Sequence, residues 1–156
     1  IAKELEETLQ AEGATVFMTR TIDTTLDMIE RIKMVEKEDP DFLISIHLNS
    51  AGRESASGVS TYYRYIGFRP LTKHVLNSML ELGLEEFGNV GSFNFALSGP
   101  TDYPNCLVEV AFLSNREDEK KILNPVFHRA VATKITEGIK SWLKECEKSA
   151  ILGSEQ

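Results

Sequence analysis

The sequence predicts an α/β fold in three layers, with a central, mostly parallel sheet flanked by helices. Segments with helical periodicity alternate along the chain with short, strand-like apolar runs, which is the pattern of layered α/β domains. Two of these runs, at residues 42–48 and 107–112, are largely apolar on both faces. Strands of this kind are typical of parallel sheets that helices cover on both sides.

Length and composition fit one globular domain. The chain has 156 residues, of which 42% are hydrophobic and 26% are charged, so long disorder and fibrous classes are excluded. We expect the domain to occupy residues 1–148 and a disordered tail to occupy residues 149–156. The net charge of −7 argues against a nucleic-acid partner, and no apolar run is long enough to span a bilayer.

A helix and a strand are expected at the beginning of the chain. Residues 1–12 carry apolar side chains at every fourth position, which form one stripe of an amphipathic helix. Gly13 ends this helix because glycine tolerates a positive φ, and the apolar centre of residues 14–19 predicts a strand. The helical pattern is already under way at Ile1, and we therefore expect the domain to begin upstream of it.

A second helix precedes the first buried strand. Thr24 or Thr25 can cap a helix over residues 26–38. Asp39-Pro40 ends that helix, because proline disfavours helical backbone in the residue before it. Residues 42–48 form a short run rich in isoleucine and leucine, which predicts a buried strand.

The middle of the chain alternates between regular and irregular segments. Residues 49–57 are small and polar and predict a loop, whereas the partial alternation of residues 58–65 predicts a strand. Residues 70–87 have the apolar spacing of a helix. Residues 88–105 are rich in glycine, serine, proline and asparagine, and an irregular segment of this length is often functional.

The last third contains the second buried strand and two helices. The strand is expected at residues 107–112. Asn115 can cap a short helix over residues 116–123. Pro125 suits the first turn of a long final helix over residues 125–146.

Two polar residues interrupt the buried strands and are the candidate site. His47 stands near the end of the first strand, and Glu109 lies inside the second. Ligand sites in open α/β sheets form outside the carboxyl ends of the strands, so both residues can reach one site if the two strands are neighbours. Burying an unpaired carboxylate is unfavourable, so Glu109 needs a cation, a donor or an open cleft beside it. Asn49 follows His47 on the same side of the strand.

Both residues also have explanations that involve no function. His47 could be a core or edge histidine with satisfied hydrogen bonds, and Glu109 could accept hydrogen bonds from backbone N–H groups at the strand end. Other chemistries find no support, because the chain has no Gly-x-Ser-x-Gly elbow, no glycine-rich phosphate loop and no Cys-x-x-Cys pair. We expect Cys106 to be a buried thiol and Cys146 an exposed one, with no bridge between them.

Three segments, taken in order, resemble those of a known family. They are Thr19-Arg20 with Asp23, Leu26 and Arg31, then Ser45-Ile46-His47-Leu48-Asn49, then Leu107-Val108-Glu109 with Phe112-Leu113-Ser114-Asn115 and Glu119. In this order and at this spacing they resemble the zinc-dependent N-acetylmuramoyl-L-alanine amidases of the amidase type 3 family.

The resemblance implies a chemistry and a partner. Members of this family bind one Zn²⁺ through His, Glu and His, and they hydrolyse the amide between N-acetylmuramic acid and the L-alanine of the peptidoglycan stem peptide. His47 matches the family's second histidine ligand and Glu109 matches its catalytic glutamate. Asn49 is then a candidate substrate-binding residue. Peptidoglycan as the partner implies a location outside the cytoplasm, in the periplasm or the cell wall.

One departure from the family pattern leaves alternatives open. The family's first histidine ligand and its glutamate ligand have no counterpart in the sequence, and we expect both upstream of Ile1. The main alternative is therefore a non-catalytic peptidoglycan-binding module of the same fold. An unrelated flavodoxin-like domain is a weaker alternative, because that class places acidic residues at the early strand ends, where this chain has His47.

Overall fold

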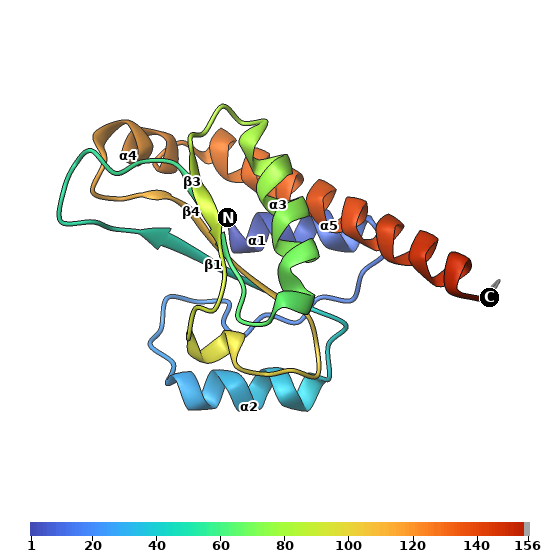
Figure 1. Ribbon diagram of the computed structural model, residues 1–156. Helices are drawn as coiled ribbons and strands as arrows, with labels where there is room; N and C mark the ends of the chain where they lie inside the picture. Colours follow the sequence, from blue (N-terminus) through green and yellow to red (C-terminus); the bar gives the residue numbers. More distant parts are fainter. Residues whose placement is uncertain (155–156) are drawn as a thin grey trace.

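A four-stranded mixed sheet forms the centre of the molecule. The computed structural model describes residues 1–154. The sheet has the order β1-β4-β2-β3, formed by β1 (Leu43–Asn49), β4 (Asn105–Phe112), β2 (Val59–Tyr62) and β3 (Glu86–Val90). β1 runs parallel to β4 and β2 runs parallel to β3, whereas β2 and β4 are antiparallel. The predicted α/β fold with a mostly parallel sheet is confirmed (Figure 1).

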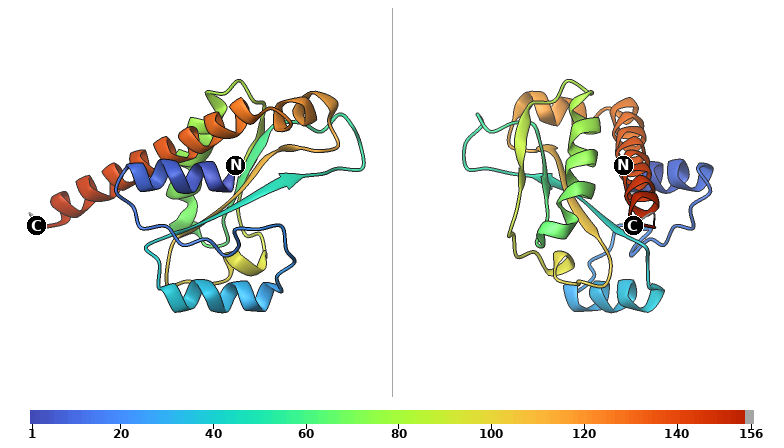
Figure 2. Two further views of the ribbon diagram at one scale, coloured as in Figure 1. Left: turned by 180° about the vertical axis from the view of Figure 1, so that it is seen from behind. Right: turned by 45° about the vertical axis from the view of Figure 1, so that its right-hand side comes forward.

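Three helices pack together on one side of this sheet. They are α1 (Ala2–Ala11), α3 (Arg69–Leu80) and α5 (Pro125–Ser154), and both α1 and α3 contact α5. The second view in Figure 2 shows this helical layer beside the sheet. The main core lies between these helices and the sheet, and its fully buried side chains include Leu71, Leu76, Met79, Val108, Val131 and Ile135.

The other side of the sheet has a thinner cover. The short 3₁₀ helix η2 (Ala96–Ser98) contacts β4 and also α2 (Met28–Glu38), which lies well apart from the three-helix layer (Figure 1). Phe93 and Phe95 pack edge-to-face against Tyr62 of β2. A second 3₁₀ helix, η1 (Ile66–Phe68), leads into α3, and α4 (Arg116–Ile122) follows β4. Among the described helices, none combines the length and apolar character needed to cross a bilayer.

The strand predicted at residues 14–19 is wrong, because this segment is irregular. A strand needs a neighbour to take its hydrogen bonds, and among the described residues no strand pairs with this segment. The two helices on either side of it match their predictions closely. Asp27, rather than Thr24 or Thr25, caps α2 by accepting a hydrogen bond from the Ile29 N–H at 2.7 Å.

The helix predicted at residues 70–87 ends early, at Leu80. Gly83 takes a positive φ of 71° beyond the helix end, and the chain then forms β3, which the sequence analysis missed. The irregular segment predicted at residues 88–105 accordingly contains the end of β3, η2 and the start of β4. The strand predicted at residues 58–65 is confirmed but is shorter, as β2.

The final helix is longer than predicted. α5 continues to Ser154, so residues 149–154, which were assigned to a disordered tail, are helical. The last two residues of that predicted tail, 155–156, lie outside the described residues. Both cysteines are free, with Cys106 buried and Cys146 exposed, as expected.

The close crossing of α3 and α5 depends on Gly138. A Cβ at this position would lie 2.6 Å from Val75 Cα and 2.9 Å from the His74 carbonyl oxygen. We predict that Gly138→Ala lowers the free energy of unfolding by ~1–3 kcal/mol, because backbone atoms would have to move apart. Gly67→Ala is the control, since a Cβ there meets nothing within 4 Å. Urea denaturation measures both variants, and equal stabilities would contradict this packing.

Candidate active site

The two faces of the sheet differ in chemistry. Successive side chains of a strand point to opposite faces. In β4 the residues Cys106, Val108 and Val110 join the core under the helical layer. Glu109, which lies between Val108 and Val110, therefore points to the opposite face, where the cover is thinner.

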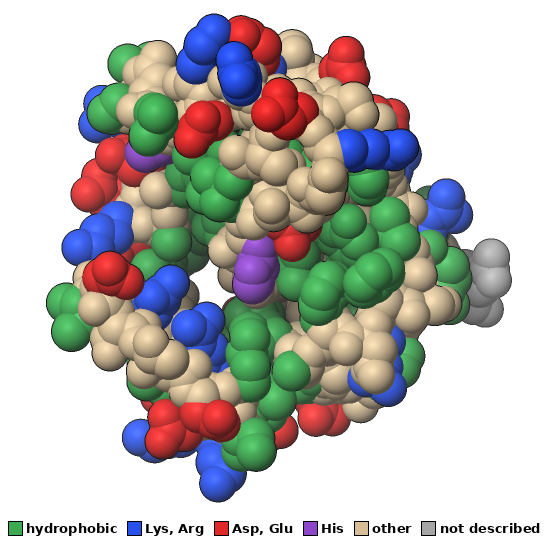
Figure 3. Space-filling model, turned by 90° about the vertical axis from the view of Figure 1, so that its left-hand side faces the viewer, with side chains coloured by type: hydrophobic (Ala, Val, Ile, Leu, Met, Phe, Trp, Pro, Cys, Tyr) green, Lys and Arg blue, Asp and Glu red, His purple; other side chains and the backbone are tan. Residues whose placement is uncertain are grey.

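His47 and Glu109 are direct neighbours across β1 and β4. The two residues are register partners in the parallel pairing of these strands. Adjacent strands lie about 4.8 Å apart, and paired residues point to the same face. The sequence-based expectation that the two residues meet across neighbouring strands is confirmed. Figure 3 shows a histidine beside an acidic side chain at the rim of a hollow in the surface.

A third polar residue extends this row. Ser60 of β2 is the register partner of Glu109 on its other side, and it is fully buried. Its hydroxyl donates a hydrogen bond of 3.3 Å to the Tyr62 hydroxyl. Ser60, Glu109 and His47 thus form a polar row across three neighbouring strands of the sheet.

Burial governs the protonation of Glu109. Its Oε2 atom is buried and has no hydrogen-bond partner among the described residues. Desolvation penalises the charged form and raises the pKa of Glu109 above its usual value of 4.5. The alternative in which backbone N–H groups satisfy the carboxylate therefore finds no support at this oxygen.

His47 is held in a different way. Its Nε2 lies 2.9 Å from Ser45 Oγ, two residues earlier on the same face of β1. Burial lowers the pKa of His47, and the positive charge of Arg31 on α2 lowers it further. Both effects favour the neutral imidazole, which is the form that binds metals. The bond to Ser45 also agrees with the alternative of an edge histidine with a local partner.

Asn49 lies beyond a distortion in the strand. The register of β1 and β4 shifts between His47 and Asn49. The Asn49 side-chain oxygen accepts a hydrogen bond from the Ser50 N–H at 2.8 Å, and its carbonyl accepts one from Leu113 at 2.8 Å. These contacts shape the end of β1, and the substrate-binding role of Asn49 stays a prediction.

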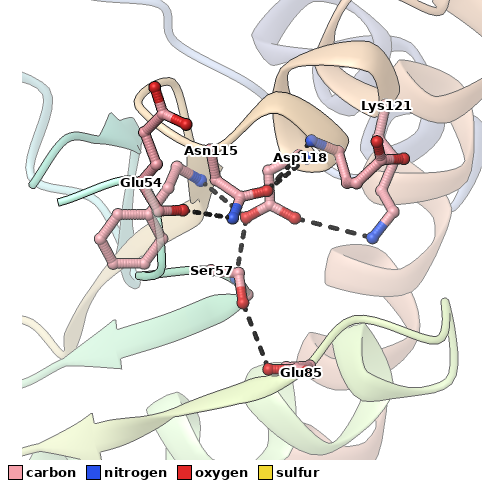
Figure 4. Close-up of polar contacts among 9 residues, drawn as sticks. Glu54, Ser57, Glu85, Asn115, Asp118 and Lys121 are labelled. Carbon is pink, nitrogen blue, oxygen red and sulfur yellow. Dashed lines mark hydrogen bonds and ion pairs between the residues drawn. The ribbon is translucent and has the colours of Figure 1, made fainter.

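Asp118 of α4 ties the loop after β1 to the end of β4. It is only 2% exposed, and its Oδ2 accepts hydrogen bonds from the backbone N–H groups of Gly58 at 2.8 Å and Phe112 at 3.0 Å. Lys121 lies 3.6 Å from its other oxygen. Asn115 caps α4 and donates to the Glu54 carbonyl at 2.7 Å (Figure 4). This cluster fixes the loop that borders the polar row.

Sequence reasoning missed three of these supporting residues. Asp118 had a usable signal, because it lies three residues after the capping Asn115 in an acidic first helical turn. Ser45 and Arg31 entered the sequence analysis only as parts of the family pattern. Neither contact with His47 could be read from spacing alone, because Arg31 and His47 lie on different elements.

The described residues do not complete a metal site. Among residues 1–154, no group of three or more His, Cys, Asp or Glu side chains is placed to hold a metal ion. A catalytic zinc ion in proteins has three protein ligands and an open position. His47 offers one imidazole, and His74 and His128 are bound elsewhere, to Ser141 with Glu145 and to the Ile122 carbonyl, respectively.

A desolvated carboxylate beside a neutral imidazole, near the carboxyl end of a strand, defines a candidate hydrolytic site on an α/β domain. Comparison with known proteins identifies the family. Residues 1–141 match the Amidase_3 family, described as N-acetylmuramoyl-L-alanine amidase, and the chain belongs to this family.

Curated relatives include proteins named probable cell wall amidase LytH. The one from Staphylococcus aureus is 31% identical over 140 residues, which are 89% of this chain and 46% of the relative. The one from Staphylococcus saprophyticus is 32% identical over 145 residues, which are 92% and 48% of the two chains. The chain thus spans about half the length of the curated relatives it matches.

Solved structures share the fold. The catalytic domain of CwlV, an N-acetylmuramoyl-L-alanine amidase from Bacillus (Paenibacillus) polymyxa var. colistinus, matches with a TM-score of 0.81 and 30% identity. An N-acetylmuramoyl-L-alanine amidase from Clostridium difficile 630 matches with a TM-score of 0.86 and 28% identity. Each match covers 92% of this chain and 80% of the solved chain.

The two N–H groups that Asp118 satisfies give a first prediction. Asp118→Ala leaves both of them buried and unpaired, and we predict a loss of roughly 3 kcal/mol in the free energy of unfolding. Glu119→Ala is the matched control, because Glu119 lies next in the same helix and is exposed. Denaturant unfolding provides the comparison. A loss in Asp118→Ala no larger than that in the control would show that the cluster is not a structural anchor.

The desolvation of Glu109 gives a second prediction. Because its pKa is raised in the folded state, the folded protein binds more protons than the unfolded chain, and stability falls as the pH rises through the interval between the two pKa values. Glu109→Gln cannot ionise and should be more stable than the original chain above this interval. Below about pH 4 the advantage should vanish. The stability advantage is measured as the difference in melting temperature between Glu109→Gln and the original chain across pH, in the presence of a chelator. Glu119→Gln is the control. An advantage independent of pH would contradict this prediction.

Proposed function

We propose that this chain forms the catalytic domain of a peptidoglycan hydrolase that cleaves the amide bond between N-acetylmuramic acid and the L-alanine of the stem peptide. The observation that carries the proposal is the half-buried Glu109 carboxylate, which has one unpartnered buried oxygen, is the register partner of His47 and has a raised pKa. Family membership supports the choice of bond and substrate. The proposed domain spans residues 1–148, and a peptidoglycan substrate places it outside the cytoplasm.

Glu109 is the proposed general base and general acid. It takes a proton from water as the water oxygen forms a bond with the carbonyl carbon of the lactyl group. It then gives that proton to the nitrogen of L-alanine as the C–N bond breaks, which yields a free carboxyl group and a free amine. A pKa raised by burial suits both roles, because it moves the carboxyl group toward the range in which it can both accept and release a proton.

Zinc is the cofactor proposed for the complete site. His47 would be one of its ligands, and its neutral imidazole suits that role. The residues described do not suffice for zinc, because they supply one imidazole where three protein ligands are needed. We therefore assign no catalytic step to a metal. Asn49, at the end of β1, stays the candidate contact to substrate.

The incomplete ligand set favours a second candidate function. A domain with this fold but without a full metal site could bind peptidoglycan without cutting it. The two functions differ in products, because only hydrolysis releases a new amino terminus on L-alanine. They share a substrate, so a binding assay alone does not separate them.

We predict that Glu109→Gln lowers the rate of wall hydrolysis by ~10²–10⁴-fold while binding to purified cell wall is retained. The measurement is the release of new L-alanine amino groups by a polypeptide that begins upstream of Ile1, with zinc supplied. Glu119→Gln is the matched control and should cleave at the original rate.

The outcomes separate the candidates. An unchanged rate in Glu109→Gln would remove Glu109 from the mechanism. Binding without any release of amino groups, in the unmutated polypeptide, would favour the binding module.

A further inference from the structure

Tyr62 of β2 points to the sheet face that carries Glu109. Successive side chains of β2 alternate between the two faces, and Val59 belongs to the core under the helices. Ser60 and Tyr62 therefore share the opposite face, where their hydroxyl groups are hydrogen-bonded. Ser60 is the register partner of Glu109, so Tyr62 is the diagonal neighbour of Glu109 across β2 and β4. Diagonal neighbours of this kind have Cα atoms ~7–8 Å apart.

Three aromatic rings meet on this face. The rings of Phe93 and Phe95 stack with their centroids 4.8 Å apart, and they pack edge-to-face on Tyr62 at 5.0 and 5.6 Å. Tyr62 is buried and Phe95 is half-buried, whereas Phe93 is 43% exposed. Figure 3 shows hydrophobic side chains gathered beside the histidine and its acidic neighbour, on the side away from the hollow. We call Tyr62, Phe93 and Phe95 the aromatic platform.

The chain around Phe93 is fixed at several points. The Phe93 N–H donates a hydrogen bond to the Tyr63 carbonyl at 3.4 Å, and the Asn94 side-chain oxygen accepts one from Arg64 at 2.7 Å. Ser92 takes a φ of 60°, a conformation that is uncommon for serine and that persists only where the surrounding structure imposes it. The exposed ring of Phe93 is therefore held in place before any ligand binds, which lowers the entropic cost of binding.

An exposed aromatic ring with polar neighbours matches one part of the proposed substrate. The face of an aromatic ring is electronegative, so it attracts the positively polarised C–H groups of a ligand and repels carboxylates. A pyranose ring presents such C–H groups on its faces and hydroxyl groups around its rim. Ser92 and Asn94, on either side of Phe93, are exposed and can hydrogen-bond to that rim. The stem peptide fits less well, because the L-alanine methyl group covers little of a ring and later residues carry carboxylates.

We propose that the aromatic platform is a glycan subsite, in which a sugar ring of the peptidoglycan strand stacks on Phe93. This inference rests on the proposed function, because it takes peptidoglycan as the ligand. The position suits the reaction, since the cleaved amide is joined through the lactyl group to the muramic acid ring, and Phe93 packs on the diagonal neighbour of Glu109. Phe93 contributes affinity and orientation of the glycan and takes no part in proton transfer.

Glycan binding, measured without cleavage, tests the subsite. The probe is soluble glycan strands of alternating N-acetylglucosamine and N-acetylmuramic acid from which the stem peptides have been removed. Isothermal titration calorimetry gives their Kd for the 156-residue chain. Phe93→Leu keeps an apolar side chain but removes the ring, and we expect its Kd to rise ~3–10-fold. Phe93→Tyr keeps the ring and should bind as the original chain does.

Phe87→Leu is the matched control. Phe87 is 48% exposed, but its ring packs on Phe112 and not on the platform, so its loss should leave the Kd unchanged. An equal Kd for Phe93→Leu and the original chain would overturn the proposal, and so would a failure of the original chain to bind glycan strands. Weaker binding of free stem peptides by Phe93→Leu, with unchanged binding of glycan strands, would identify a peptide subsite and overturn it as well.

Proton NMR of the bound glycan provides a second readout. Sugar C–H protons that lie over an aromatic face move upfield because of the ring current. We expect such shifts with the original chain and with Phe93→Tyr, and their loss with Phe93→Leu. Absence of upfield shifts with the original chain, or shifts that persist in Phe93→Leu, would overturn the proposal. Both readouts are independent of hydrolysis, so a chain that binds glycan through Phe93 but releases no L-alanine amino groups would support this subsite and contradict the proposed function.

Discussion

The parallel pairing of β1 with β4 is the constraint on which the site depends. It makes His47 the register partner of Glu109 and leaves both side chains on the face away from the helical layer. On the other face the same two strands contribute to the main core, so the geometry of the polar pair is fixed by apolar packing a few ångströms away. A slip of one residue would turn Glu109 into that core, which gives the register a large energetic preference.

The site illustrates a conflict between stability and reactivity. An apolar residue at position 109 would suit a buried strand better than a carboxylate with one unpaired oxygen. The same burial raises the pKa of Glu109, which is the direction that favours a carboxyl group in proton transfer. Arg31 and Ser45 act on His47 from α2 and β1, and Asp118 holds the neighbouring loop. The surrounding fold therefore stabilises a locally unfavourable arrangement.

Much of the fold and the central pair could be predicted from sequence, for identifiable reasons. Polar residues inside apolar runs are conspicuous, and strand ends in α/β sheets gather in one place, so His47 and Glu109 were found without coordinates.

The failures have physical causes as well. β3 was hidden because three of its five residues are Glu86, Gly88 and Asn89, which do not give the apolar alternation of a strand. Gly83, with its positive φ, lies in the turn between α3 and β3. Residues 14–19 have strand-like composition, but among the described residues no strand lies beside them to take their hydrogen bonds. The contacts of Arg31 and Asp118 depend on the distances between elements, which local sequence does not encode.

The proximity of His47 and Glu109 can be measured directly by disulfide trapping. In a Cys146→Ser background, cysteines are placed at both positions as His47→Cys with Glu109→Cys. Register partners on one face lie within the Cα separation that a disulfide requires. We predict rapid cross-linking of this pair under mild oxidation, and little cross-linking when His47→Cys is combined with Val110→Cys, which faces the core. Failure of the first pair to cross-link, or equal cross-linking of both pairs, would contradict the arrangement on which the proposed chemistry rests.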